Sequence, residues 1–194
     1  MNTQLQHDLL APSAWVCRFA RLIVAGGAVL DLACGQGRHA RYLAGLGYLV
    51  EAVDRDSASL AAFAGVAGIT PRCADLERSP WPFEAGRFDG IVVSNYLYRP
   101  LINDLLGTLR PGGVLIYETF ALGNEKLGRP SNPEFLLRPH ELLQWVEGRL
   151  QVLAFEQGLV ELPRPAVIQR ICAIRRGIED CRLDLSIPAT SAMR

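Results

Sequence analysis

This sequence of 194 residues has few of the residue types that build metal sites and disulfide frameworks. Its three histidines lie far apart along the chain, which does not fit the ligand spacing of a zinc site. Its five cysteines are an odd number and contain no Cys-x-x-Cys pair. Small core residues in a reducing compartment are therefore a better interpretation than disulfides or metal ligands. We predict no metal centre.

The sequence also lacks a long apolar run and an excess of either charge. No stretch reaches the roughly 20 apolar residues of a transmembrane helix, and the N-terminus has no signal-peptide core. Twenty acidic side chains balance twenty basic ones, of which only Lys126 is a lysine. This balance argues against general attraction to nucleic acid or to an anionic membrane surface. We expect a cytoplasmic protein with neither as a partner.

The composition that is present is that of an ordinary globular protein. Hydrophobic residues make up 49% of the chain and charged residues 21%. A chain of this length can bury a full hydrophobic core in one domain, and no internal repeat is visible. We predict a single domain over residues 1–176, N-terminal helix included. Residues 177–194 show little periodicity and are predicted to form a loosely ordered tail.

Strands and helices are predicted to alternate over the first two thirds of the chain. Apolar runs bounded by turn residues predict strands at 28–33, 48–53, 69–74, 88–93 and 114–120. Amphipathic stretches predict helices at 12–25, after Gly37, at 57–64 and at 99–109. Such alternation is typical of βαβ units, which form a parallel sheet with right-handed crossovers.

The last third of the sequence follows a different pattern. Residues 121–135 form a polar segment that is longer than a usual connection. A helix is predicted at 139–150, followed by strands at 151–162 and 166–175. The short link between these two strands requires a hairpin, so an antiparallel pair is expected at the edge of the sheet.

Acidic residues stand at the ends of three successive predicted strands. They are Asp31, Asp54 and Asp75, and Asn95 follows the fourth strand. Open α/β sheets bind ligands outside the carboxyl ends of their strands. One acid at such a place is often only a helix cap, but three in successive strands favour a ligand site.

The nature of that ligand depends on Asp31. Gly35 and Gly37 alone resemble the phosphate-binding loop of dinucleotide enzymes, and Asp54 suits a ribose diol. Asp31, however, would repel a pyrophosphate and suits a cationic amine or sulfonium. Asp75 is placed to accept a hydrogen bond from an adenine amine. An adenosine that carries a positive charge fits all these positions, whereas NAD fits only the glycines and Asp54.

Five motifs resemble, in order and spacing over roughly residues 28–120, those of class I S-adenosylmethionine-dependent methyltransferases. They are Asp31-Leu-Ala-Cys-Gly35-Gln-Gly37, Asp54, Cys-Ala-Asp75, Phe88-Asp89-x-Ile-Val and Leu109-Arg-Pro-Gly-Gly113. The resemblance implies an α/β, Rossmann-like, doubly wound seven-stranded sheet, mostly parallel with an antiparallel C-terminal edge hairpin. It also implies S-adenosylmethionine as cofactor. Ala33 departs from the pattern, because many members have a glycine there.

The resemblance assigns cofactor binding to a set of residues on the rim of the sheet. These are Asp31, Ala33, Cys34, Gly35, Gly37, Asp54, Arg55, Ala74, Asp75, Leu76 and Asn95. The segment from Tyr117 to Leu142 also resembles small bacterial methyltransferases of the tellurite-resistance and thiopurine types, but no substrate is carried over from that likeness.

The expected reaction is methyl transfer to a small-molecule acceptor by in-line displacement. The protein then has to align the nucleophile with the methyl group and exclude water. Three residues are candidates for the catalytic side of the site. Tyr96 would flank a flat or sulfur-bearing substrate, Arg99 would hold an anion and Glu118 would face the same rim. A local cap is the competing interpretation for Arg99.

Other functions remain open at this stage. An RNA- or protein-directed methyltransferase has the same cofactor motifs, although the neutral charge balance argues against an RNA substrate. A non-catalytic S-adenosylmethionine-binding protein would also share them. The acceptor atom (S, O or N) and the use of a general base are left open, and the chain is expected to be a monomer or homodimer.

Overall fold

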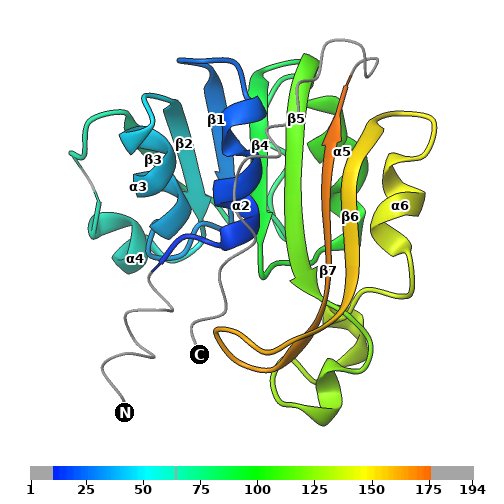
Figure 1. The fold of residues 1–194 in the computed structure, drawn as a ribbon. Coiled ribbons are helices and arrows are strands. Elements are labelled where there is room, and N and C mark those ends of the chain that lie inside the picture. Colours follow the sequence, from blue (N-terminus) through cyan, green and yellow to red (C-terminus); the bar gives the residue numbers. More distant parts are fainter. Residues whose placement is uncertain (1–10, 64, 176–194) are drawn as a thin grey trace, which may run out of the picture.

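Seven strands form one mixed sheet in the computed structural model, which describes residues 11–63 and 65–175. Their order is β3-β2-β1-β4-β5-β7-β6 (Figure 1). The strands are β1 (Ala28–Leu32), β2 (Leu49–Asp54), β3 (Ile69–Cys73), β4 (Phe88–Ser94), β5 (Leu109–Phe120), β6 (Gln151–Val160) and β7 (Ala166–Ile174). β1 to β5 are parallel, and β7 is antiparallel to both of its neighbours. The predicted fold class is confirmed, and β6 rather than the last strand is the edge.

Helices connect and cover these strands, and they are shorter than predicted. They are α2 (Ala14–Phe19), α3 (Arg38–Gly45), α4 (Ser57–Ala61), α5 (Ile102–Gly107) and α6 (Glu141–Val146). The 3-10 turns are η1 (Ala20–Leu22), η2 (Arg99–Leu101), η3 (Asn124–Lys126) and η4 (Pro133–Phe135). α6 begins two residues after Pro139 because His140 has a left-handed backbone with φ of 59°. The predicted tail at 177–194 lies outside the described residues.

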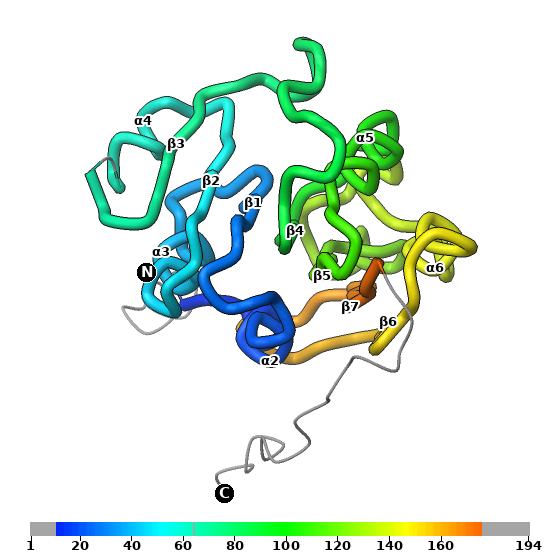
Figure 2. The backbone as a smooth tube through the Cα atoms, turned by 90° about the horizontal axis from the view of Figure 1, so that it is seen from above, coloured from blue at the N-terminus to red at the C-terminus, as the bar shows by residue number. Residues whose placement is uncertain are grey.

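The sheet separates two hydrophobic cores. α2 and α3 lie on one face of it, and α5 and α6 lie on the other (Figure 2). Because side chains alternate along a strand, Val29 packs with α2 whereas the next residue, Leu30, packs in the core that includes Leu105 of α5. Burial on both faces explains why the central strands are almost continuously apolar.

One predicted turn belongs to a strand. Residues 110–113 were expected to end a helix before a strand at 114, but β5 already begins at Leu109. Gly112 N donates to the carbonyl of Arg175, and Arg175 N donates to the carbonyl of Gly113, so hydrogen bonds with the end of β7 extend the strand through this segment. A register shift between Phe88 and Gly90 accommodates the irregular pairing with β4.

Within residues 11–63 and 65–175, none of the helices is long and apolar enough to cross a membrane. The same residues contain no group of three or more His, Cys, Asp or Glu side chains that could hold a metal ion.

Candidate functional site

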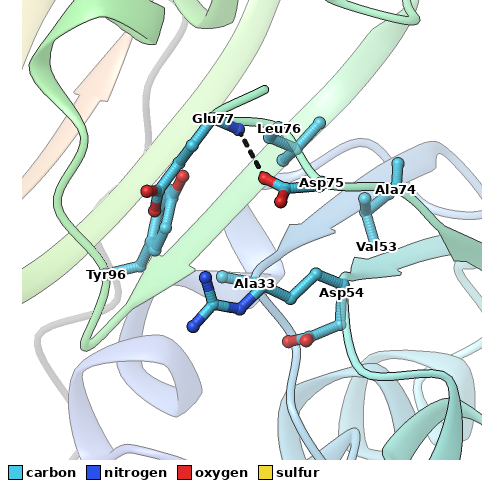
Figure 3. Close-up of a pocket in the computed structure, with 9 residues that line it drawn as sticks. Ala33, Val53, Asp54, Ala74, Asp75, Leu76, Glu77 and Tyr96 are labelled. Atoms are coloured by element: carbon cyan, nitrogen blue, oxygen red, sulfur yellow. Dashed lines mark hydrogen bonds between the residues drawn. The ribbon is translucent and has the colours of Figure 1, made fainter. Parts of the chain in front are cut away.

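A pocket of about 200 Å³ opens at the carboxyl ends of the parallel strands (Figure 3). The loops after β1, β2, β3 and β4 all contribute to it, as expected for an open α/β sheet. Its lining residues are Ala33, Val53, Asp54, Arg55, Ala74, Asp75, Leu76, Glu77 and Tyr96. Six of them belong to the predicted cofactor set, and Tyr96 belongs to the predicted catalytic set.

Asp54 is held in a fixed orientation at the end of β2. Its Oδ2 accepts a hydrogen bond from Gly35 N at 2.8 Å, and its Oδ1 accepts one from Asp56 N at 2.9 Å. A carboxylate oxygen has a second lone pair, so both oxygens keep an acceptor site. This arrangement can receive two neighbouring hydroxyl groups, such as those of a ribose.

Asp75 is fixed in a similar way in the loop after β3. Its Oδ1 accepts a hydrogen bond from Glu77 N at 3.0 Å, which closes a local turn (Figure 3). The neighbouring Leu76 is buried and provides an apolar part of the lining, next to Ala74. An apolar surface beside a fixed carboxylate suits a flat heterocycle that carries an amino group.

The loop between β1 and α3 turns through left-handed backbone at three residues. Ala33 and Gly35 have φ of 53° and Gly37 has φ of 74°. This conformation costs a residue with a Cβ about 1–2 kcal/mol, which explains why a glycine is common at the position of Ala33 in the resembling family. A Cβ on Gly35 would meet no atom within 4 Å.

Gly37 has a packing role in addition to its place in the predicted cofactor loop. A Cβ there would lie 2.7 Å from the Phe63 ring. Gly37 therefore allows the loop to pack against Phe63 as well as to turn.

Asp31 lies deeper than the other acids, inside β1. It is 1% exposed, and its Oδ2 has no hydrogen-bond partner in the described structure. Burial raises the pKa of Asp31 from its usual 3.8 to about 7, although a hydrogen bond from the Ala40 backbone and the charge of Arg38 act in the opposite direction. A buried carboxylate oxygen without a partner favours a cation or a donor supplied by a ligand.

Cys34 has a buried side chain in this loop. Its Sγ lies 3.7 Å from the carbonyl oxygen of Gly35. Burial, together with the negative charges of Asp31 and Asp54, raises the pKa of the thiol far above its usual range. The thiol therefore stays protonated and is not a nucleophile at neutral pH.

Arg38 and His39 join the loop to other parts of the rim. Arg38 donates to Ser94 Oγ at 3.1 Å and to the carbonyl of Ala11 at 3.4 Å. His39 Nε2 accepts a hydrogen bond from Ser13 N at 3.1 Å, and burial lowers the pKa of His39 to about 3, so the ring is neutral. The first turn of α3 thereby fixes the start of the described chain and the end of β4.

Tyr96 forms one wall of the pocket. The Tyr117 hydroxyl donates to its backbone carbonyl at 2.8 Å. Burial is the main reason why the pKa of Tyr96 is far above its usual value, and the neighbouring Glu77 adds to it. The phenol is therefore protonated at neutral pH. Asn95, just before it, has left-handed backbone with φ of 57°, is exposed and is not among the residues that line the pocket.

Arg99 does not line the pocket. Its guanidinium donates to both carboxylate oxygens of Glu141, at 2.7 and 3.0 Å, and to the carbonyls of Glu134 and Leu136. These four hydrogen bonds commit the group to protein partners, so the geometry does not favour the expected contact with an anionic substrate.

Glu118 is also placed differently from the expectation. Its carboxylate lies 3.5 Å from Arg170 of β7, and the Arg170 guanidinium lies 4.7 Å from the centre of the Trp15 ring. Glu118 therefore points to the face of the sheet that carries α2, opposite to Tyr117. Its ion pair favours a role in joining β5 to β7.

Two residues of the pocket were not identified from the sequence. Val53 precedes Asp54 in β2, and Glu77 follows Leu76 in the loop after β3. The spacing of Asp75 and Glu77 is that of a turn in which a side chain accepts a hydrogen bond two residues on, so this signal was present.

The strand order, the loop after β1 and the carboxylates on the rim are those expected of a class I S-adenosylmethionine-dependent methyltransferase domain. Residues 29–113 match the family model described as a methyltransferase domain. The resemblance to this family seen in the sequence is therefore confirmed.

The chain is similar to one curated protein and to several solved structures. It is 35% identical over 109 residues to protein-L-isoaspartate O-methyltransferase from Chlorobaculum tepidum, an alignment covering 54% of this chain and 50% of that protein. The structure of TehB from Haemophilus influenzae superimposes with a TM-score of 0.68 and 20% identity, over 91% of this chain and 63% of that one. The structure of an S-adenosylmethionine-dependent methyltransferase from Mesorhizobium loti superimposes with a TM-score of 0.64 and 20% identity, over 83% of this chain and 97% of that one. The chain thus spans about half of its curated relative, and the structural likeness shows the fold.

The family implies S-adenosylmethionine as cofactor, and the residues present fit this molecule. Asp54 offers two oriented acceptors for the ribose, and Asp75 lies beside an apolar surface for the adenine. The unpartnered buried oxygen of Asp31 suits the positively charged methionine end. The positive charges of the cofactor lie at its methionine end, so Asp31 is the carboxyl group of the three that faces them in this arrangement.

Proposed function

We propose that this protein is an S-adenosylmethionine-dependent methyltransferase that acts on a small-molecule acceptor. The observation that carries the proposal is the pocket at the carboxyl ends of the strands. Asp54 and Asp75 line it as hydrogen-bond acceptors of fixed orientation, and the loop that follows Asp31 of β1 lies beside them. A dinucleotide would bring a pyrophosphate to that loop, where the buried carboxylate disfavours it.

Each part of the pocket has a proposed role. Asp54 accepts hydrogen bonds from the ribose hydroxyls, with Arg55 beside it. Asp75, between Ala74 and Leu76, binds the adenine. Asp31 and the loop from Ala33 to Gly37 serve the methionine end, in which Cys34 contributes its small size. Asn95 is proposed to lie beside the cofactor where the substrate enters, which is supported by its position directly before Tyr96.

The cofactor supplies an electrophilic methyl group on a positively charged sulfur. The proposed reaction is an in-line displacement, so the main task of the chain is to align the acceptor and exclude water. Tyr96 is supported as an aromatic wall that donates a hydrogen bond. It is not supported as a general base, because its phenol holds its proton at neutral pH.

A small acceptor is supported by the charge of the chain. The equal numbers of acidic and basic residues give no general attraction to a nucleic acid. Because Tyr96 is not supported as a general base, the proposal favours acceptors that need not lose a proton before attack, such as neutral amines and thiolates.

A protein acceptor is the second candidate. The observation in its favour is the 35% identity with a protein-L-isoaspartate O-methyltransferase. That likeness covers only half of the relative, so it carries less weight for the acceptor.

Binding and turnover are tested separately. Calorimetry on the purified chain is expected to detect S-adenosylmethionine and S-adenosylhomocysteine and to give no heat with NAD. Release of S-adenosylhomocysteine is then followed with thiols, thiopurines, tellurite, small phenols, amines and an isoaspartyl peptide. Binding of NAD without S-adenosylmethionine would overturn the proposal. Turnover with the peptide alone would select the protein acceptor.

A further inference from the structure

The wall formed by Tyr96 is linked to the C-terminal third of the chain. The Tyr117 hydroxyl donates to the Tyr96 carbonyl at 2.8 Å, and Tyr117 is itself 2% exposed. The Tyr117 ring meets Trp145 of α6 edge-on, with 5.9 Å between the ring centres. Two aromatic side chains thus connect the backbone of Tyr96 to α6.

A second link joins the same two parts of the molecule three residues further along the chain. Arg99 follows Tyr96 in the segment after β4, and its guanidinium forms a bidentate ion pair with Glu141, the first residue of α6. It also donates to the carbonyls of Glu134 and Leu136, at 2.7 and 2.9 Å. The segment that carries Tyr96 is therefore fixed at both ends.

The ion pair is partly removed from solvent. The Glu141 side chain is 7% exposed and that of Arg99 is 26% exposed. Burial alone would raise the pKa of Glu141, but hydrogen bonds from Arg99 and from the Arg138 backbone lower it below its usual value. The carboxylate therefore remains charged, and a bidentate pair of this kind fixes direction as well as distance.

We propose that Arg99, Glu141 and Tyr117 are positioning residues that hold Tyr96 in the wall of the cofactor pocket. They act through Tyr96 and do not touch the bound molecule. This inference rests on the proposed function, because it takes the pocket to be the S-adenosylmethionine site. Under this proposal the segment between β5 and α6 helps to shape the pocket, although none of its residues lines the pocket.

A double-mutant cycle tests whether these residues act through Tyr96. The affinity for S-adenosylhomocysteine is measured by calorimetry for Tyr117→Phe and Arg99→Lys, each with Tyr96 intact and with Tyr96→Ala. With Tyr96 present, each change is expected to weaken binding about threefold to tenfold, the effect of a lost hydrogen bond. With Tyr96→Ala, the same changes are expected to have less than about a twofold effect.

Arg149→Lys is the matched control. Arg149 lies in the C-terminal third, and it donates hydrogen bonds to the side chain and the backbone of Asn103 in α5. These bonds do not involve residues 95–101, so its replacement is expected to leave affinity unchanged in both backgrounds. Circular dichroism selects a temperature at which every variant is folded. If Arg99→Lys does not fold, Tyr117→Phe carries the test, because it removes one oxygen atom only.

The possible results separate this inference from the proposed function. Equal losses of affinity in both backgrounds, or no loss in either, would overturn the positioning role while the wild-type chain still binds S-adenosylhomocysteine. Failure of the wild-type chain to bind either S-adenosylhomocysteine or S-adenosylmethionine would overturn the proposed function itself.

Discussion

Asp54 and Gly35 are joined by a hydrogen bond of 2.8 Å between the Oδ2 atom of the carboxylate and the backbone N–H of the glycine. The end of β2 and the loop after β1 therefore hold each other in place before any ligand arrives. Such preorganisation lowers the entropic cost of ligand binding.

Asp54→Asn tests the proposed ribose contact. The amide keeps the shape of the side chain but loses the charge, so affinity for S-adenosylhomocysteine is expected to fall by about 2 kcal/mol, or roughly 30-fold. Calorimetry measures this change. Asp56→Asn is the control, because it changes a side chain that caps α4 through Ala58 N and Ser59 Oγ and keeps the backbone N–H that donates to Asp54. Equal affinities of the wild type and Asp54→Asn would exclude the ribose role.

Asp31 predicts a dependence of stability on pH. Its pKa is raised in the folded chain to about 7, so the folded protein retains a proton that the unfolded chain releases above about pH 4. The stability that this proton provides is complete at low pH and is lost as pH rises through 7. Asp31→Asn removes the penalty at high pH.

The difference in stability between Asp31→Asn and the wild type is therefore expected to depend on pH. Relative to the wild type, the variant is expected to be about 2 kcal/mol more stable at pH 8.5 than it is at pH 5.5. Denaturant titration at the two pH values, without cofactor, measures the difference. A difference that does not change with pH would show that Asp31 titrates at its usual value.

Gly37→Ala tests the packing explanation for the second glycine. The added Cβ would lie 2.7 Å from Phe63 and would keep a φ of 74°, so a loss of about 2–4 kcal/mol in stability is expected. Gly35→Ala is the matched control, since it has the backbone cost but no steric overlap. Chemical denaturation measures both. Equal losses in the two variants would remove Phe63 from the explanation.

Tyr96→Phe separates an aromatic wall from a general base. Because the phenol is protonated at neutral pH, its removal is expected to slow methyl transfer by no more than about tenfold and to leave the pH profile unchanged. Tyr96→Ala, which removes the ring, is expected to have the larger effect. The rate of S-adenosylhomocysteine release with an active acceptor is the measurement. Loss of an ionisation from the profile of Tyr96→Phe would contradict this prediction.

The sequence predicted the sheet well because each central strand is a buried apolar run that ends near an acid or a glycine. The positions of Asp54 and Asp75 followed from those strand ends, and both line the pocket. Helix lengths were less predictable, since local geometry such as the left-handed backbone of His140 decides where α6 begins.

The catalytic candidates show a different limit. Arg99 and Glu118 stand close to the rim in the sequence, but the partners that decide their directions, Glu141 and Arg170, come from segments more than 40 residues away. No local pattern contains that information. Glu77 was missed for the opposite reason, because its signal is a two-residue turn within an ordinary polar loop.

The place of β7 has a consequence for the order in which the chain can assemble. β6 is synthesised before β7, yet β7 is its neighbour in the sheet and in turn pairs with β5. The edge strand therefore has nothing to pair with until residues 166–174 have been synthesised. During translation the cofactor side of the sheet can form early, whereas the completion of the other side waits for nearly the whole described chain.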